Sequence, residues 1–130
     1  MITMSSRAGL ITGGLLGALG VAAGAFGAHA LRGSVDARSL EIWRTAAHYQ
    51  QIHAVAILAA ALWVAADPRP LRRLALTLFT FGVVIFSGTL YPLALGGPKI
   101  LGAITPIGGL CLIAGWLALA ADGLRGRPSS

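Results

Sequence analysis

The sequence has little charge, one cysteine and few carboxylates. Only 11% of its 130 residues are charged and 56% are apolar, whereas an ordinary soluble domain is about 25% charged. A chain with so few charged residues cannot form a polar surface in contact with water, which argues against a soluble enzyme. The apolar content also excludes a disordered chain. The single cysteine, Cys111, excludes a disulfide framework and a cysteine-cluster metal site.

The sequence shows no pattern that indicates catalysis. Its carboxylates fall in predicted loops or at predicted helix ends, at Asp36, Glu41, Asp67 and Asp122. None is placed as an acid or base inside the membrane, and no nucleophile–base pair or strand-linked phosphate loop is present. The sequence therefore favours a non-enzymatic protein without a bound cofactor or metal, with a membrane enzyme as the alternative.

The net charge of +6 comes from ten basic residues. These residues lie at the edges of apolar stretches and do not form one stripe, which is where membrane proteins place Lys and Arg, at the level of the lipid headgroups. The charge therefore predicts a lipid bilayer as the partner and no nucleic acid.

Four apolar segments are each long enough to cross a hydrocarbon core, which takes about 20 residues. They cover residues 8–31, 46–66, 74–95 and 100–121. Backbone groups in lipid must be satisfied within the segment, so all four are expected to be helices. The first segment ends in a sequence resembling a signal-peptide cleavage site, but its apolar run is longer than the usual 7–15 residues. We expect an all-α, four-helix transmembrane bundle forming a single membrane domain.

Two connections leave alternatives open. Between the first two spans, Leu40, Trp43 and Ala47 fall at helical spacing, which predicts a short interfacial helix that continues into the second span, with Trp43 at headgroup level. A polar loop is the alternative. In the last span, Thr105 is followed by Pro106, so Thr105 could instead cap a shorter helix that starts at Pro106.

The distribution of Lys and Arg predicts the orientation. With four spans, both termini and the 67–73 loop share one side of the membrane, which holds six basic residues, and the other side holds four. The count favours a bacterial inner-membrane protein with both termini in the cytoplasm.

Glycines form a regular seam along the first span. Gly13, Gly17, Gly20, Gly24 and Gly27 are spaced by four, three, four and three residues, so they share one helix face. Small residues let helix backbones approach closely in lipid. The seam predicts packing within the chain, and self-association or assembly into a larger membrane complex is the alternative.

Polar residues within the spans are the best candidates for a functional site, because each costs free energy in hydrocarbon unless it is paired. Tyr49, Gln50 and His53 share a helix face, and the topology places His29 and His53 in the same outer third of the membrane. The first interpretation is a polar clamp between helices. The alternatives are a haem, metal or small-ligand site through His29 and His53, and a proton or solute path.

A second group of polar residues lies on the same side of the membrane. Ser87 and Tyr91 share a face of the third span, and Thr105 lies near the start of the fourth. Together with the first group they predict a pocket on that side. Its seven candidate residues are His29, Tyr49, Gln50, His53, Ser87, Tyr91 and Thr105.

Four motifs together resemble a known family. They are Gly24-Ala-Phe-Gly-Ala-His-Ala-Leu31, Thr45-Ala-Ala-His-Tyr-Gln-Gln-Ile-His53, Phe86-Ser-Gly-Thr-Leu-Tyr91, and Ile104-Thr-Pro-Ile-Gly-Gly109 followed by Ala114-Gly-Trp116. In this order they resemble the domain of unknown function 423 family, small multi-pass inner-membrane proteins related to mitochondrial transmembrane protein 256. The resemblance implies a multi-pass membrane protein and supplies no activity. The family pattern falls on Phe26, Gly27, His29, Tyr49, Gln50, His53, Ser87, Gly88, Tyr91, Thr105, Pro106, Gly108 and Gly109.

Overall fold

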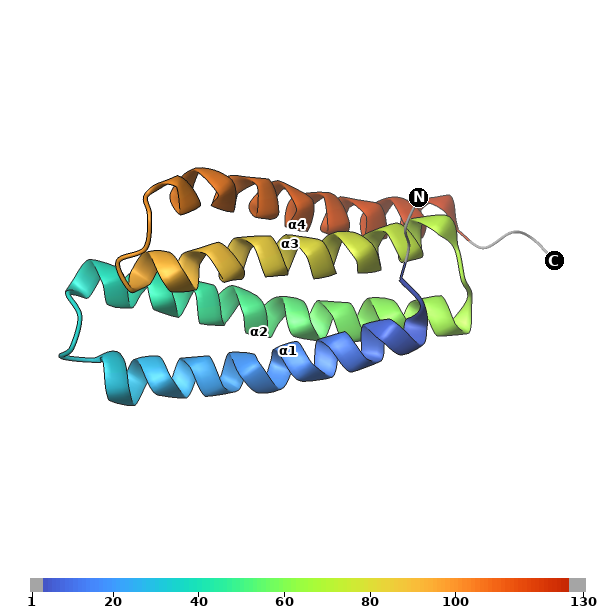
Figure 1. Ribbon diagram of the computed structural model, residues 1–130. Helices are drawn as coiled ribbons and strands as arrows, with labels where there is room; N and C mark the ends of the chain where they lie inside the picture. Colours follow the sequence, from blue (N-terminus) through green and yellow to red (C-terminus); the bar gives the residue numbers. More distant parts are fainter. Residues whose placement is uncertain (1–3, 127–130) are drawn as a thin grey trace.

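A computed structural model describes residues 4–126, which form four long helices in an up-and-down order (Figure 1). Helix α1 covers Ser6–Phe26 and ends in a π-helical turn, η1, over Gly27–Leu31. Helix α2 covers Ala37–Ala66, α3 covers Pro70–Ala94 and α4 covers Ile100–Arg125. The start of α1 and the end of α4 lie at one end of the molecule. We call this the termini end, and the opposite end, with residues 27–37 and 94–100, the far end.

All four helices are long and apolar enough to cross a membrane. The shortest of these candidate spans has 25 residues, which at 1.5 Å per residue exceeds a hydrocarbon core of about 30 Å. The predicted all-α architecture with four spanning helices is therefore confirmed.

Local signals explain where the helices begin. The Ser5 hydroxyl accepts a hydrogen bond from the Ala8 backbone N–H (3.1 Å) at the start of α1, and Asp36 accepts from Ser39 N–H (2.7 Å) at the start of α2. These are N-caps. The hydrogen bond from Ser39 holds the pKa of the exposed Asp36 carboxyl below its usual value. Pro70 occupies the first turn of α3, where its missing N–H costs nothing.

At both places where the sequence left an alternative open, the structure has a continuous helix into or through the span. The segment after Asp36 is the continuous start of α2, so a helix does run into the second span and the alternative of a polar loop is wrong. Helix α4 begins at Ile100 and passes through Pro106, so the alternative of a shorter helix starting at Pro106 is also wrong. The Thr105 hydroxyl donates to the Leu101 carbonyl (2.9 Å) within that helix.

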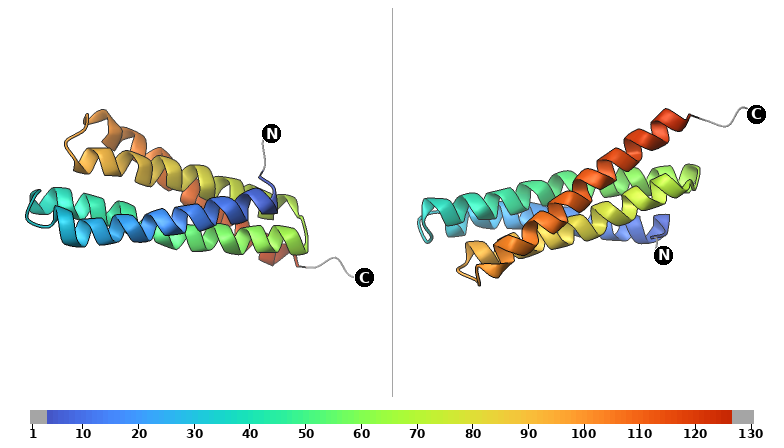
Figure 2. Two further views of the ribbon diagram at one scale, coloured as in Figure 1. Left: turned by 60° about the horizontal axis from the view of Figure 1, so that its bottom comes forward. Right: turned by 90° about the horizontal axis from the view of Figure 1, so that it is seen from above.

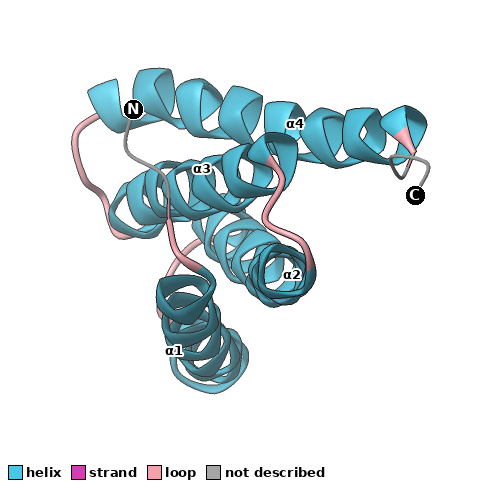
Figure 3. Ribbon diagram, turned by 90° about the vertical axis from the view of Figure 1, so that its right-hand side faces the viewer, coloured by secondary structure: helices cyan, strands magenta, loops and turns pink. Residues whose placement is uncertain are grey.

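The helices form an open layer in which each packs on its neighbour in the chain. Seen from the termini end, α1, α2, α3 and α4 follow a zigzag (Figure 3). Within the described residues α1 and α4 do not pack together, and α1 and α3 approach each other little. Helix α4 crosses the other helices obliquely (Figure 2). The bundle is therefore not closed by a contact between its first and last helices.

The most deeply buried large apolar side chains lie on α2 and α3. The largest fully buried side chains are Ile57 on α2 and Leu76, Phe79 and Val83 on α3. Small residues belong to the same core: α2 contributes buried alanines at 56, 60 and 61. Apolar burial gives no net drive between helices in lipid, so this region depends on close contact.

The glycine seam of α1 faces α2. A Cβ at Gly13 would meet the Leu58 side chain at 2.8 Å, and one at Gly20 would meet Gln51 at 3.0 Å. A Cβ at Gly27 would lie 2.6 Å from the Trp43 ring. The other two members, Gly17 and Gly24, also have α2 side chains as their nearest neighbours. The seam thus serves contact within the chain.

The closest backbone approach is between α3 and α4, at Gly108. A Cβ on Gly108 would lie 2.5 Å from the Phe86 backbone nitrogen and 2.8 Å from the Gly82 carbonyl oxygen. Backbone atoms cannot rotate away as a flexible side chain can. A side chain at this position therefore requires the two helices to separate.

We predict that Gly108→Ala destabilises the protein by about 1–3 kcal/mol, the usual cost of overpacking a tight contact. Gly14→Ala is the matched control, because a Cβ at Gly14 has no heavy atom within 4 Å. Thermal unfolding in one detergent should show a lower melting temperature for Gly108→Ala and an unchanged or slightly higher one for Gly14→Ala, because alanine favours the helix by about 0.5–1 kcal/mol. Equal melting of the two variants would contradict the close helix contact.

Candidate functional site

Gln50 joins three helices through one side chain. It lies on α2 and is only 5% exposed. Its Nε2 donates to the Leu16 carbonyl of α1 (2.9 Å), and its Oε1 accepts from the Tyr91 hydroxyl of α3 (2.6 Å). An unpaired amide in hydrocarbon is costly, so these two bonds hold α1 and α3 at fixed positions on α2.

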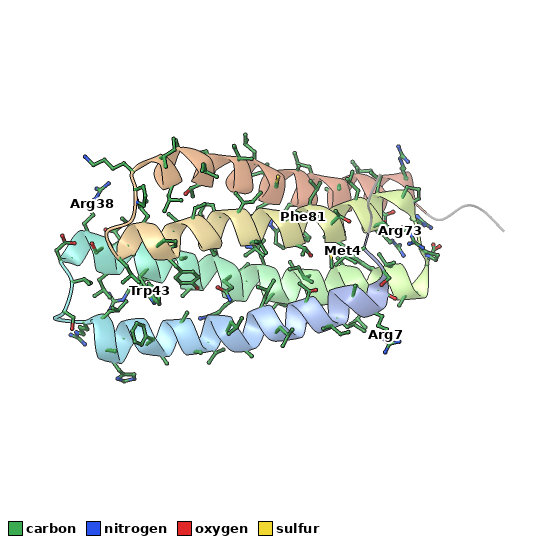
Figure 4. All side chains as sticks on the ribbon, viewed as in Figure 1. Met4, Arg7, Arg38, Trp43, Arg73 and Phe81 are labelled. Atoms are coloured by element: carbon green, nitrogen blue, oxygen red, sulfur yellow. The ribbon has the colours of Figure 1, made fainter. Side chains whose placement is uncertain are left out.

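Trp43 forms a second junction, nearer the far end. Its indole Nε1 donates to the Ala23 carbonyl of α1 (2.8 Å). Its ring lies edge-on to Tyr91, with centroids 4.6 Å apart, and 5.5 Å from the ring of Phe26. Figure 4 shows the labelled Trp43 side chain between α1 and α2. The sequence predicted Trp43 at headgroup level, and the structure adds that it binds α1.

Two further side chains donate to carbonyls of neighbouring helices. Gln51 Nε2 donates to the Gly20 carbonyl of α1 (2.8 Å), and the buried Ser87 hydroxyl of α3 donates to the Ala46 carbonyl of α2 (2.8 Å). With Gln50 and Trp43, these bonds form a polar clamp that we define by Trp43, Gln50, Gln51, Ser87 and Tyr91. The clamp interpretation of the polar residues thus has a specific geometry.

His53 is held in one tautomer by its two neighbours. The Trp116 indole of α4 can only donate, and it donates to His53 Nε2 (3.0 Å). Nε2 must therefore be unprotonated, which leaves the proton on Nδ1 to donate to the Tyr49 carbonyl (2.8 Å). The imidazole is neutral and buried, between the rings of Phe79 and Trp116. A metal could bind only after one of these bonds is broken.

The seven predicted pocket residues do not gather in one place. Gln50, Ser87 and Tyr91 line one cavity. Thr105 instead bonds Thr89 within the α3–α4 contact (2.6 Å). Tyr49 is 40% exposed and stacks near His53 and Phe86.

The expectation that His29 and His53 meet between the first two spans is wrong. His29 is exposed in the π-helical turn that ends α1, and His53 bonds only Tyr49 and Trp116 among the described residues. Ala54 lies opposite Gly17 of α1, so His53 is near the level of Gly17, and His29 is twelve residues further along that helix. Twelve helical residues span about 18 Å, so the expectation that both histidines share the same outer third of the membrane is also wrong.

Sequence reasoning missed the roles of two tryptophans and one threonine. Trp43 and Trp116 both donate to groups on other helices, and Thr89 pairs with Thr105. The signal was available in the case of the tryptophans, because an indole N–H within an apolar span normally has an acceptor. The identity of the acceptor was not, since backbone carbonyls carry no sequence signature.

A cavity of about 360 Å³ opens between α1 and α3, with α2 as its floor. Four of its lining residues belong to the clamp: Trp43, Gln50, Ser87 and Tyr91. The rest of the lining is apolar or glycine, at Leu16, Leu19, Ala23, Val83, Val84 and Gly88. A Cβ at Gly88 would have no heavy atom within 4 Å. The cavity is within the size range of small-ligand sites, and we call it the α1/α3 cleft.

No group of three or more His, Cys, Asp or Glu residues that could hold a metal ion occurs among residues 4–126. Their buried polar side-chain atoms all have a hydrogen-bond partner. The buried polar side chains of this part of the chain are therefore paired with one another or with backbone carbonyls.

Fold and site together define a small four-span membrane protein whose helices are joined by polar clamps. Residues 23–109 match the family described as "Protein of unknown function (DUF423)". The chain belongs to this family, so the resemblance carried by the four sequence motifs is confirmed.

Similar proteins are membrane proteins of the same small size. A UPF0382 membrane protein of Staphylococcus saprophyticus is 43% identical over 110 residues, covering 85% of this chain and 91% of the relative. The UPF0382 membrane protein YwdK of Bacillus subtilis is 34% identical over 118 residues (89% and 95%). The UPF0382 inner membrane protein YgdD of Escherichia coli is 34% identical over 128 residues (94% and 93%). No solved structure matches the chain.

We predict that Tyr91→Phe lowers the free energy of unfolding by about 0.6 kcal/mol and by at most about 1.7 kcal/mol, the measured range for such bonds between membrane helices. The variant leaves Gln50 Oε1 without its donor. Gln50→Leu should cost more, because it removes two bonds. The double variant should cost less than the sum of the single ones, since both remove the same bond.

Tyr49→Phe is the matched control, because Tyr49 is 40% exposed and its hydroxyl has no hydrogen bond within the described part of the chain. Denaturant unfolding in mixed micelles measures all four variants on one scale. Strict additivity of Tyr91→Phe and Gln50→Leu would show that the clamp bond contributes nothing.

Proposed function

We propose that this protein is a non-enzymatic accessory protein that works by binding an apolar transmembrane helix of another membrane protein. The observation that supports this proposal best is the internal pairing of the buried polar side chains within the described spans. A catalytic acid, base or metal ligand must be free to meet a substrate. Here Gln50, Tyr91 and His53 are occupied with holding helices together.

The same pairing favours a protein without a bound cofactor. Haem or metal ligation through His53 requires loss of the bond from Trp116 or of the bond to Tyr49. His29 lies exposed on another part of the layer. Both histidines would have to leave their present surroundings to share one ligand.

The α1/α3 cleft is the surface that fits a partner helix. It opens toward the lipid between two helices that barely touch. Gly88 stands in its wall although nothing in the chain crowds it, and glycine within a helix costs about 0.5–1 kcal/mol relative to alanine. Internal packing does not require this glycine. A small residue there keeps room for atoms from outside the chain, as close helix contacts in membranes need.

A photo-crosslinking amino acid placed at Val84 tests the proposal in cells. Val84 lines the cleft and is 54% exposed, and Phe81 on the same helix is 52% exposed and lies outside the cleft. We expect a crosslinker at position 84 to give one discrete protein product, a crosslinker at position 81 to give none, and Gly88→Phe to abolish the product by filling the cleft.

Other outcomes would overturn the accessory role. A crosslinked product of twice the chain's mass would assign the cleft to self-association. Crosslinks to lipid alone would show that no partner helix occupies the cleft. A haem absorbance band or stoichiometric metal in the purified protein, lost in His53→Ala, would establish the cofactor alternative instead.

We further propose that the protein lies in the bacterial inner membrane with both termini in the cytoplasm. The E. coli relative is named an inner membrane protein. Six basic residues share the termini side and four the other side, which favours a cytoplasmic termini side. Figure 4 shows Arg7 and Arg73 at the termini end and Arg38 at the far end.

We expect a reporter fused to the C-terminus to be active in the cytoplasm, because the positive-inside bias places the termini end there. A topology reporter pair, with one enzyme active only inside and one only outside the cytoplasm, makes this measurement. Activity of the external reporter at the C-terminus would reverse the orientation.

A further inference from the structure

A second and larger cleft lies between α2 and α4, on the other side of the layer. Its volume is about 770 Å³. Val55, Ala59 and Trp63 form its α2 wall, and Trp116, Leu119 and Ala120 form its α4 wall. The lining is apolar, and the backbones of the two helices do not meet within the described residues. We call it the α2/α4 cleft.

One end of this cleft adjoins a fixed pair of guanidinium groups. The Arg72 guanidinium carbon lies 5.6 Å from the centre of the Trp63 ring. The Arg72 Nε donates to Asp122 Oδ2 (2.8 Å). Asp122 lies two residues beyond Ala120 on α4. Arg72 Nη1 also donates to the Trp63 carbonyl (3.3 Å). Apolar surface therefore leads directly to arginine at the termini end.

Arg69 is held beside Arg72. Its Nε donates to Asp67 (2.7 Å) and its Nη1 to the Gly126 carbonyl (2.7 Å). The two arginine side chains are only 17% and 14% exposed. Both guanidinium groups are thus preorganised, which lowers the entropic cost of binding an anion. Among residues 4–126, no hydrogen bond uses the Nη2 group of either arginine.

The charge of this end complements an anion. Among the described residues, the termini end has five arginines, at 7, 69, 72, 73 and 125, and two carboxylates, at 67 and 122. The carboxylates fix Arg69 and Arg72 but do not balance the whole end, which keeps a charge of +3. Basic residues beside a membrane surface attract anionic lipid, by about 1 kcal/mol for each Lys or Arg.

We propose that the α2/α4 cleft binds one anionic phospholipid, with an acyl chain along the cleft and the phosphate at Arg69 and Arg72. The apolar cleft and the arginines lie in the order that an amphipathic lipid requires. Gly123 supports this path, because it continues the helix face of Trp116 and Ala120 and has open space where a Cβ would be. The proposal does not depend on the accessory role, which concerns the opposite side of the layer.

The test is lipid retention by the whole protein. We would reconstitute the chain in phosphatidylcholine vesicles with a minor fraction of phosphatidylglycerol and release it into mild detergent. Native mass spectrometry then counts the lipids that stay bound. We expect one retained phosphatidylglycerol, enriched about 30-fold over phosphatidylcholine relative to the vesicles. This enrichment corresponds to about 2 kcal/mol, within what the net charge of +3 at this end supplies at about 1 kcal/mol per charge.

Two variants fill the cleft from opposite walls. Ala120→Phe and Ala59→Phe both place a ring in the cleft from exposed positions, and each should abolish retention. Ala103→Phe is the matched control on α4, exposed and outside the cleft, and it should retain the lipid. Equal melting temperatures of the lipid-free variants show that the fold is intact. Retention that survives both filling variants would overturn the proposal.

A variant that removes one arginine charge distinguishes recognition of the lipid headgroup from binding of the acyl chain. Arg69→Gln leaves the Arg72–Asp122 pair in place and should lower the preference for phosphatidylglycerol at least several-fold while a lipid is still retained. Arg38→Gln, at the far end, is its control. Equal retention of both lipids by the native protein would overturn headgroup recognition. If inorganic phosphate raised the melting temperature of the lipid-free protein as much as phosphatidylglycerol does at the same concentration, the arginines would be assigned to a free anion instead.

Discussion

The arrangement of the helices depends on the side-chain amide of Gln50. Helices in lipid gain little from apolar burial against each other, so packing and hydrogen bonds decide how they associate. Gln50 bonds α1 on one side and α3 on the other, and these two helices have little contact of their own. Among the described residues, Gln50 is the side chain that hydrogen-bonds both α1 and α3, so its amide couples the positions of these two helices.

The clamp uses α1 in an unusual way, because α1 contributes backbone and not side chains. Its acceptors are the carbonyls of Leu16, Gly20 and Ala23. These positions are four and three residues apart, so they face α2 together. The glycine seam gives this pattern its physical reason, since a Cβ at Gly24 would lie 3.0 Å from Gln51 Nε2. The glycines bring α2 donors within reach of α1 carbonyls.

The sequence predicts the helices better than their arrangement. Length and hydropathy suffice for four spans, and the regular spacing of glycines predicts a packing face. Lipid accepts apolar residues on every side of a helix, so periodicity does not show which face is buried. Zigzag packing in chain order was therefore not predictable from composition.

The candidate site was predictable by residue type and not by partner. Gln50, Ser87 and Tyr91 are polar residues in apolar spans, and they do meet around one cavity. His29 and His53 do not share a depth, because α2 begins at Ala37, nine residues before the predicted start of the second span, and His53 lies near the level of Gly17 of α1. The direction of His53, toward Trp116 of α4, depends on which helix packs beside it and was not predictable from the spacing.

An open layer has consequences for what the protein can do in a membrane. Each cleft lies between helices two apart in the chain, so the two clefts face lipid on opposite sides, with α2 and α3 between them. Gln50 lies at the floor of one cleft, and the His53–Trp116 bond joins the helices that form the other. A solute path through one chain would have to pass the packed core at Phe79 and Ile57, which is fully buried. The two clefts therefore lie on the outer surfaces of the layer, away from that core.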